Sequence, residues 1–304
     1  GYGFPDGHPF SADRQQAFLD EALRRGLLPA LRRLEPRIAS VDELGGFHTR
    51  AYVERIVRGS QTGEGWLDYG DTPCFRGVLE AAGAVGGSAL DALAQVIGGT
   101  APRSFQPIGG LHHARRNSAA GFCVINDIGI VIESLRKQHG VNRIAYVDID
   151  VHHGDGVFYS YEDDPDLIVV DIHEDGHYQY PGTGHARERG TGKAEGSKLN
   201  LPLLPGASDG DFLEAWAAAE EFLRDQRPSI ILMQCGADSL EGDPLGHLDL
   251  SPASHAYATQ RLCRLANEMC EGRLMAFGGG GYNLTNIGHG WCAVVEELLR
   301  GSWR

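Results

Sequence analysis

The chain has 304 residues, of which 42% are apolar and 22% are charged, as expected for a soluble globular protein with a sizeable core. Its formal net charge of −14 at pH 7 argues against a nucleic-acid partner, whose phosphates it would repel. No apolar run approaches the roughly 20 residues needed to span a bilayer, so we expect no membrane partner either. Such an acidic chain can attract a cationic substrate. The alternative is that the charge only keeps the protein soluble.

The cysteines and the first residues both favour a cytoplasmic protein. The six cysteines show no C-x-x-C pair or regular spacing, which favours reduced thiols over a disulfide framework. The segment Gly-Tyr-Gly-Phe-Pro-Asp-Gly-His at residues 1–8 lacks the basic-then-apolar pattern of a secretory signal peptide. We therefore expect cytoplasmic localisation.

The first hundred residues are predicted to be mainly helical. Residues 13–25 carry apolar side chains at helical spacing, including Phe18 and Ala22, and residues 80–97 are rich in Ala and Leu. Between these helices, residues 59–73 are polar and rich in turn-forming residues, which predicts an exposed loop.

From residue 105 onward, short apolar runs alternate with amphipathic helices. The candidate strands lie at residues 143–148, 167–172, 230–234 and 274–277. The candidate helices lie at residues 128–139, 211–224 and 252–270. The apolar runs show no clear alternation, as in strands covered on both faces. We predict an α/β fold with one domain over residues 1–304: a doubly wound, mainly parallel sheet flanked by helices, with the active site at the carboxyl ends of the strands.

Three residues of metal-ligand type follow two of these strands. Asp150 and His152 come just after the run at residues 144–147, and Asp238 follows the run at residues 230–234. Two carboxylates and one imidazole leave an open position on a divalent cation, which is the layout of a catalytic zinc site. A lone Asp-x-His pair is more often a strand-end ion pair, but Asp238 after a second strand favours the metal.

The tandem pair His112-His113 suits acid–base chemistry beside a metal. One imidazole can take a proton from water while the other stabilises charge, and each needs a carboxylate on its far nitrogen. Asp148 and Asp155 lie in the same segment as the metal-ligand candidates and are available for that purpose. A single histidine here would more often be structural.

Four glycines at positions 278–281 precede Tyr282, directly after the predicted strand at residues 274–277. A glycine run is also typical of a flexible turn or a phosphate-binding loop, but neither G-x-G-x-x-G nor a following Lys-Ser/Thr is present. Beside a metal and two histidines, we expect the hydroxyl of Tyr282 to reach a developing oxyanion.

Several longer motifs contain these residues. In chain order they are Gly-Gly-Leu-His-His-Ala around His112, Gly-Phe-Cys-Val-Ile-Asn-Asp from Gly121, Asp-Ile-Asp-Val-His-His-Gly-Asp from Asp148, Tyr-Pro-Gly-Thr-Gly from Tyr180, Gly-Ala-Asp ending at Asp238, and Gly-Gly-Gly-Gly-Tyr-Asn around Tyr282. With His-Pro at residues 8–9 and Tyr-Gly-Asp-Thr-Pro at residues 69–73, the set resembles the zinc-dependent histone deacetylase family, in particular its bacterial deacetylase-like and acetoin-utilisation branch. The resemblance covers nearly the whole chain and implies the arginase/deacetylase fold.

The resemblance implies catalytic roles for the matching positions. One Zn²⁺ per chain would be bound by Asp150, His152 and Asp238. His113, paired with Asp155, would be the general base and acid. His112, paired with Asp148, would assist electrostatically. Tyr282 would polarise the amide oxygen of the substrate.

The resemblance also implies a substrate tunnel. Phe122 and Tyr180 would form its walls around the acylated alkyl chain. Gly121 and Gly280 would contribute backbone contacts, and Asp71 on the rim would bind the main chain of the substrate.

Some positions depart from the family pattern. Leu111 stands where eukaryotic relatives usually have Trp, and Tyr180 where many have Phe. Leu245 occupies the position at which a polyamine-selective relative carries Glu, which argues against a polyamine preference.

The family also holds a structural K⁺ through residues matching Asp148, Asp150 and the carbonyl of His152. Asp171 replaces a common Ser near that site, which puts the affinity or identity of the ion in doubt.

The related binuclear ureohydrolases need further Asp ligands where this chain has Gly154 and Leu240, so one catalytic metal is expected rather than two.

The expected activity is hydrolysis of an Nε-acetyl-lysine-like substrate, in a protein or peptide, to a free amine and acetate. The alternative is a hydrolase of small acylated amines, such as acetylpolyamines or other amidated metabolites. A non-enzymatic binding protein would be expected to lack a metal ligand, a catalytic His or the Tyr, and all are intact. The rim segments 61–73 and 175–191 are expected to set selectivity, and the second could shape a contact within a homo-oligomer.

Overall fold

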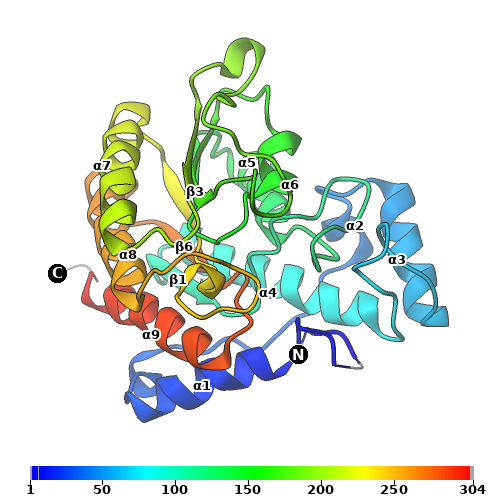
Figure 1. The fold of residues 1–304 in the computed structure, drawn as a ribbon. Helices are drawn as coiled ribbons and strands as arrows, with labels where there is room; N and C mark the ends of the chain where they lie inside the picture. The colour runs from blue at the N-terminus through cyan, green and yellow to red at the C-terminus, as the bar shows by residue number, and fades with distance from the viewer. Residues whose placement is uncertain (1, 6, 302–304) are drawn as a thin grey trace.

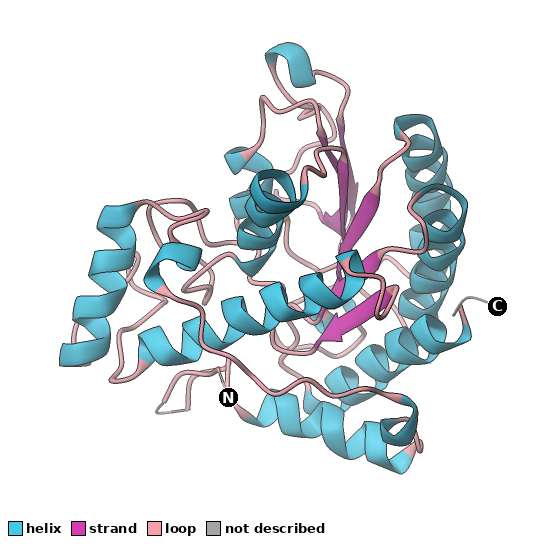
Figure 2. Ribbon diagram, turned by 180° about the vertical axis from the view of Figure 1, so that it is seen from behind, coloured by secondary structure: helices cyan, strands magenta, loops and turns pink. Residues whose placement is uncertain are grey.

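A parallel sheet of six strands runs through the middle of the protein, with helices on both sides (Figures 1 and 2). The structure, a computed structural model, describes residues 2–5 and 7–301; the ends of the predicted domain at 1 and 302–304 lie outside this range. The strands are β1 (Arg103–Gln106), β2 (Ile144–Asp148), β3 (Leu167–Glu174), β4 (Lys198–Leu203), β5 (Ile230–Gln234) and β6 (Leu274–Phe277). Their order in the sheet is β1-β6-β5-β2-β3-β4, and every pairing is parallel.

The predicted central strands are confirmed, whereas both edge strands were missed. β2, β5 and β6 are wholly buried, as their unbroken apolar runs predict. β1 reads Arg-Ser-Phe-Gln and β4 reads Lys-Leu-Asn-Leu-Pro-Leu, and each pairs with a single neighbour. Polar residues and proline are tolerated at sheet edges, so a search for continuous apolar runs does not find such strands.

The five helices that were predicted begin and end close to the predicted positions. The helices of the structure are α1 (Asp13–Arg24), α2 (Val41–Leu44), α3 (Arg50–Thr62), α4 (Val78–Ile97), α5 (Asp127–His139), α6 (Asp155–Ser160), α7 (Asp209–Gln226), α8 (Pro252–Met269) and α9 (Leu284–Arg300). The predicted ones are α1, α4, α5, α7 and α8. The side chain of Ser251 caps α8 by accepting from the Ala253 amide at 3.2 Å, with Pro252 in the first turn. Helices α2, α3, α6 and α9 were not predicted.

The prediction of an exposed loop over residues 59–73 was partly wrong. Helix α3 continues to Thr62, and Leu67 and Thr72 are fully buried. The amide of Leu67 donates to the carbonyl of Thr72 at 2.9 Å, which folds this segment back onto itself. The polar composition reflects the outer side of a folded segment rather than free chain.

Alternate residues of each central strand face different cores. Ile144 and Tyr146 of β2 belong to the core under α3, α4 and α5, while Ala145 and Val147 belong to the core under α1, α7, α8 and α9. Figure 1 shows these two groups of helices on opposite sides of the sheet. Both faces of the strands are therefore covered, which explains why their sequences lack apolar–polar alternation.

The strand order places a switch point between β2 and β5. From β2 the chain runs outward to β3 and β4, and it then returns to the other side of β2 with β5 and β6. In doubly wound sheets, the connections beyond such a point diverge and leave a crevice at the carboxyl ends of the strands. Asp150 and His152 follow β2, and Asp238 follows β5, so the fold brings the metal-ligand candidates to this crevice.

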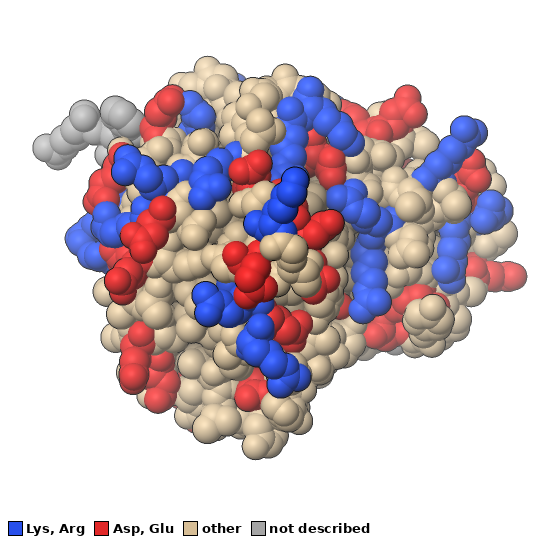
Figure 3. Space-filling view, turned by 90° about the horizontal axis from the view of Figure 1, so that it is seen from above, with Lys and Arg blue, Asp and Glu red and all other residues tan. Residues whose placement is uncertain are grey.

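The surface carries charges of both signs. On the face seen in Figure 3, Lys and Arg side chains are interspersed with Asp and Glu. Within residues 2–5 and 7–301, no helix is long and apolar enough to cross a membrane.

Two buried tryptophans provide a test of this packing. The indole N–H of Trp291 donates to the carbonyls of Cys235 and Gly278 at 3.2 and 3.0 Å, whereas the equally buried N–H of Trp216 has no acceptor among the described residues. Replacement of Trp by Phe removes a similar volume at both positions, but only at residue 291 does it strand two buried acceptors. We expect Trp291→Phe to lower the free energy of unfolding by about 1–3 kcal/mol more than Trp216→Phe.

Urea unfolding of both variants measures this difference. Equal losses would show that the hydrogen bonds of Trp291 contribute nothing beyond packing.

Candidate active site

Many of the predicted site residues line one pocket at the carboxyl ends of the strands. The pocket is lined by Phe10, Gly110, Leu111, His112, His113, Gly121, Cys123, Asp150, His152, Asp238, Gly279, Gly280 and Tyr282. These residues come from loops after β1, β2, β5 and β6 and from the N-terminal segment. The structure thus brings together the predicted metal ligands, the tandem histidines, the tyrosine and two of the predicted substrate-binding glycines.

The three metal-ligand candidates form a compact buried group. The Nδ1 atom of His152 lies 3.0 Å from Oδ1 of Asp150 and 3.3 Å from Oδ2 of Asp238. Both carboxylates are fully buried, and one ligand atom from each residue lies within 4.8 Å of the others. Burial lowers the pKa of His152, but hydrogen bonds to Asp150 and Asp238 outweigh it and raise the pKa to about 10. Without a metal, protonated His152 would thus act as the cation between the two carboxylates.

Other contacts fit this group to a metal. Oδ2 of Asp238 is buried and accepts no hydrogen bond of good geometry from the described residues. Its polar neighbour there is Nδ1 of His152 at 3.3 Å, so the oxygen keeps lone pairs for a cation. Burial and the charge of Asp150 raise the pKa of Asp238 to about 7, which a cation would reverse.

Glycines pack directly against the two ligand carboxylates. A Cβ on Gly280 would lie 1.9 Å from Oδ2 of Asp238, and one on Gly236 would lie 2.0 Å from Oδ2 of Asp150. Side chains at these positions would displace the carboxylates, so the glycines leave room for the ligand set to close around an ion.

Each tandem histidine is held by its own carboxylate. The Nδ1 atom of His112 lies 2.7 Å from Oδ2 of Asp148, and Nδ1 of His113 lies 2.7 Å from Oδ1 of Asp155. These two pairings are those predicted from the sequence. They leave the two Nε2 atoms facing each other at 3.1 Å. A hydrogen bond between these two nitrogens requires that one of them carries the hydrogen and the other accepts it.

The environment favours neutral His113. Burial and the neighbouring His112 lower the pKa of His113 to about 4, although the hydrogen bond to Asp155 opposes that shift. Its free imidazole nitrogen is therefore available to accept a proton near neutral pH.

The pKa of Asp148 shifts in the opposite direction from that of His113. Burial and the charges of Asp171 and Asp150 raise the pKa of Asp148 well above its usual range. It nevertheless accepts hydrogen bonds from His112 and the hydroxyl of Tyr146.

Tyr282 also lines the pocket. Burial and the charge of Asp238 raise the pKa of Tyr282 well above its usual value, so the phenol keeps its proton and can donate it in a hydrogen bond. Its position is fixed from the backbone, because the amide of Tyr282 donates to Oδ2 of Asp243 at 2.7 Å. The aromatic rings of Phe122 and Phe10 lie 6.0 and 6.4 Å away.

Phe122 and Tyr180 lie near the reacting groups from two sides. The ring of Tyr180 is 5.1 Å from that of His113 and 6.1 Å from that of His152. Phe122 has a left-handed backbone with φ of 66°, which is unusual for a non-glycine residue and directs its ring toward Tyr282. The preceding Gly121 has no room for a side chain, since a Cβ there would lie 2.4 Å from the His113 ring. Both predicted wall residues thus lie close to residues that line the pocket, and their contact with a substrate stays a prediction.

Two predicted substrate-binding residues lie farther out. Asp71 is exposed and accepts a hydrogen bond from the hydroxyl of Thr72 at 2.9 Å. Leu245 is half-buried, and its carbonyl accepts from the amide nitrogen of the Gln179 side chain at 2.8 Å. Neither lines the deep pocket, so any contact with substrate is at the rim.

Asp171, a predicted ligand of a second cation, is already well paired. Its Oδ1 lies 2.7 Å from Nδ1 of His173, and its Oδ2 accepts from the amide of Gly154 at 2.9 Å. Burial raises its pKa, but the charge and hydrogen bond of His173 outweigh this and leave the pKa lowered.

Three residues that support the site were not predicted. Arg14 of α1 is fully buried and donates to the carbonyls of Gly281 and Gly279, and its guanidinium lies 4.0 Å from the Phe10 ring centre. Gln234 donates to Oδ2 of Asp150 at 2.7 Å, and Asp243 holds the Tyr282 loop. An arginine on the apolar face of a helix was the available signal for Arg14. For the other two, only the fold shows the contact.

Comparison with known proteins identifies the family. Residues 8–298 match the histone deacetylase domain. The chain is 36% identical over 306 residues to the acetoin utilization protein AcuC of Bacillus subtilis (strain 168), covering 98% of this chain and 79% of that protein. The chain belongs to the histone deacetylase family. The motif resemblance and the branch predicted from the sequence are confirmed.

Two further histone deacetylase relatives agree with this assignment. Histone deacetylase 8 of Danio rerio is 32% identical over 282 residues, covering 90% of this chain and 73% of that protein. The crystal structure of the HDA15 HD domain superposes with a TM-score of 0.89 at 28% identity, covering 98% of this chain and 85% of that one. The predicted arginase/deacetylase-like fold is therefore confirmed, and family membership supports deacetylase activity.

The orphaned oxygen of Asp238 gives a test of metal binding by this histone deacetylase family member. We expect Asp238→Ala to weaken tight zinc binding at least about tenfold, because the remaining ligands cannot complete the site. Elemental analysis after dialysis measures the retained zinc. Asp225→Ala, on the exposed side of α7, serves as the control and should retain one equivalent. Unchanged zinc content in the Asp238 variant would contradict the assignment of this ligand.

Proposed function

We propose that the protein is a zinc-dependent deacetylase that hydrolyses the amide of an Nε-acetyl-lysine-like substrate to a free amine and acetate. The observation that carries the proposal is the convergence of three elements on one pocket: the His113–Asp155 pair, the protonated hydroxyl of Tyr282, and the unsatisfied oxygen of Asp238. They would serve as the general base, the hydrogen-bond donor to the oxyanion and a ligand atom for the metal, which metal-assisted amide hydrolysis needs.

Zinc would be held by Asp150, His152 and Asp238. When bound, it supplies Lewis-acid activation of a water and of the amide carbonyl. Membership of a family that is generally zinc-dependent supports this assignment, as do the buried ligand oxygens. A single catalytic ion is proposed in this pocket, because Gly154 and Leu240 offer no further side-chain ligand.

The residues of the chain carry the proton transfers. His113 takes a proton from the attacking water on Nε2, since its Nδ1 is engaged by Asp155. Tyr282 keeps its proton and donates a hydrogen bond from its hydroxyl to the carbonyl oxygen, as negative charge develops there. His113 then returns the proton to the departing amine nitrogen. His112, held by Asp148, keeps the neighbouring charge balanced through these steps.

The predicted substrate-binding residues, at the pocket and its rim, suit a linear substrate. Phe122 and Tyr180 would contact the alkyl chain, Gly121 and Gly280 would contribute backbone contacts, and Asp71 would meet the main chain of a peptide. The mechanism is equally compatible with a small acylated amine, which is the second candidate. Leu245 at the rim favours the peptide, since it offers no charge to a polyamine.

A bound K⁺ is also part of the proposal. Asp148, Asp150 and Asp171 are fully buried acidic residues whose charges interact. A monovalent cation beside Asp148 and Asp150 would offset this repulsion. We further propose that residues 1–304 form one catalytic domain.

Tyr282→Phe tests the oxyanion donor. The variant keeps the ring and its contacts with Phe122 and Phe10 but lacks the hydroxyl, so turnover is expected to fall at least roughly 10²-fold with folding preserved. Initial rates on an acetyl-lysine peptide and thermal melting provide the measurements. Near-normal turnover would remove Tyr282 from the mechanism.

His113→Ala tests the proton acceptor. Its loss is expected to lower kcat at least roughly 10²-fold while leaving bound zinc unchanged, because His113 does not belong to the ligand group. The variant should still fold, although its unfolding midpoint is expected to fall because buried Asp155 loses its hydrogen bond to His113. If the rate survived, His112 would have to be the base.

Release of amine from an acetyl-lysine peptide and from acetylputrescine, measured side by side, tests the function as a whole. We expect turnover of the peptide that a chelator abolishes and added zinc restores. Turnover of acetylputrescine alone would retain the chemistry and move the function to small acylated amines. No turnover of either substrate by zinc-loaded protein would contradict the proposal.

A further inference from the structure

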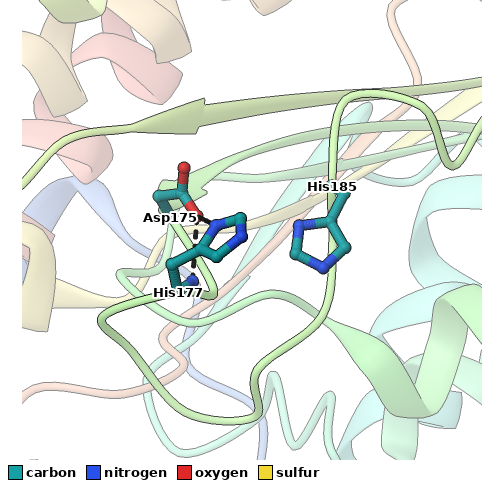
Figure 4. Close-up of side chains that lie close together, drawn as sticks. All are labelled: Asp175, His177 and His185. Atoms are coloured by element: carbon teal, nitrogen blue, oxygen red, sulfur yellow. Dashed lines mark hydrogen bonds and ion pairs between the residues drawn. The ribbon is translucent and has the colours of Figure 1, made fainter.

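A second group of metal-ligand side chains lies on the loop that follows β3. Asp175, His177 and His185 come from the two ends of the segment that carries Tyr180 (Figure 4). In Figure 4 the imidazole of His177 stands against Asp175, and His185 faces it from the neighbouring stretch of chain. The group is separate from Asp150, His152 and Asp238.

The backbone of both stretches is fixed. The amide of Asp175 donates to the carbonyl of Leu203 at the end of β4, at 2.7 Å. On the other stretch, the amide of His185 donates to Oε1 of Glu188 at 2.8 Å. Between them, a Cβ on Gly176 would lie 2.5 Å from the carbonyl oxygen of Thr183, so the two stretches touch. His177 and His185 are thus held close together by the fold, without any ion.

The side chains themselves have the arrangement of a metal site. One ligand atom from each residue lies within 4.8 Å of the others, and the two imidazole ring centres are 4.9 Å apart. A tetrahedral zinc ion with bonds of about 2.0–2.1 Å needs nitrogen and oxygen atoms about 3.3 Å apart. Rotations of these partly exposed side chains can close that difference, since exposed side chains change rotamer freely.

Asp175 already prepares His177 for this role. Its Oδ1 lies 2.6 Å from Nδ1 of His177 and accepts from the His177 amide at 2.9 Å. Because metal ligands must be deprotonated, an ion bound between these two side chains would replace the hydrogen that they share. The side chain of His185, by contrast, makes no hydrogen bond with any residue that the structure describes, so its nitrogens are available.

We propose that Asp175, His177 and His185 form a second binding site for a divalent transition cation such as Zn²⁺, at the rim of the active-site loop. A site with two imidazoles and one carboxylate favours such transition cations, because Mg²⁺ and Ca²⁺ prefer oxygen ligands. The exposed position and the small ligand number make this site weaker than the buried one. An ion held there joins both ends of the loop, and Tyr180 lies between them.

Zinc binding by the full chain already loaded with one equivalent tests this site. Equilibrium dialysis against buffered free zinc is expected to show a second, weaker equivalent. His177→Ala and His185→Ala should each weaken that second equivalent at least about tenfold and leave the first unchanged. His139→Ala, at the exposed end of α5, is the matched control and should bind both.

The outcomes separate this site from the buried one. Asp238→Ala is expected to lose the tight equivalent and retain the weak one. Binding of a single equivalent by the unaltered chain, or a second equivalent that survives both histidine substitutions, would overturn the proposal. His177 is largely exposed, so its variant is expected to fold even if the His185 variant does not.

Discussion

The site depends above all on burying several carboxylates next to one another. Asp148, Asp150 and Asp238 are each fully buried at the ends of β2 and β5. Taking such charges out of water is costly unless donors or cations compensate, and here the fold supplies both. Asp148 is bonded by His112 and Tyr146, whereas Asp150 receives the side chain of Gln234. Oδ2 of Asp238 accepts no hydrogen bond of good geometry from the described residues, and it is this oxygen that we propose as a ligand of the cation.

The pocket walls are connected through a short series of hydrogen bonds at the rim. Gln179, next to Tyr180, donates to the carbonyl of Leu245. Asp243 accepts from the amide of Leu245 with one oxygen and from the amide of Tyr282 with the other. Tyr180 and Tyr282 are therefore both positioned through the segment that contains Asp243 and Leu245. Changes at the rim are expected to alter both binding and rate, because neither element is held independently.

Most of the catalytic residues could be predicted, because each lies in a short motif. Strand-end residues such as Asp150 and His152 are recognisable from the apolar run before them, and the carboxylate partners of the tandem histidines lie close by in the sequence. Arg14 could not be assigned in this way, since its partners Gly279 and Gly281 are more than 260 residues distant in the chain. The edge strands β1 and β4 also escaped prediction, because strands that pair on one side only do not need continuous apolar sequence.

The sequence by itself determined the family, the α/β alternation and the chemistry of the ligand set, because local patterns and residue types carry that information. Only the tertiary structure decided which groups touch. It set the 3.1 Å contact between the Nε2 atoms of His112 and His113, and it left the Asp238 oxygen without a hydrogen bond. It also brought His177 beside His185, by pressing Gly176 against Thr183. These contacts depend on how strands and loops distant along the chain pack together, and no local pattern encodes that packing.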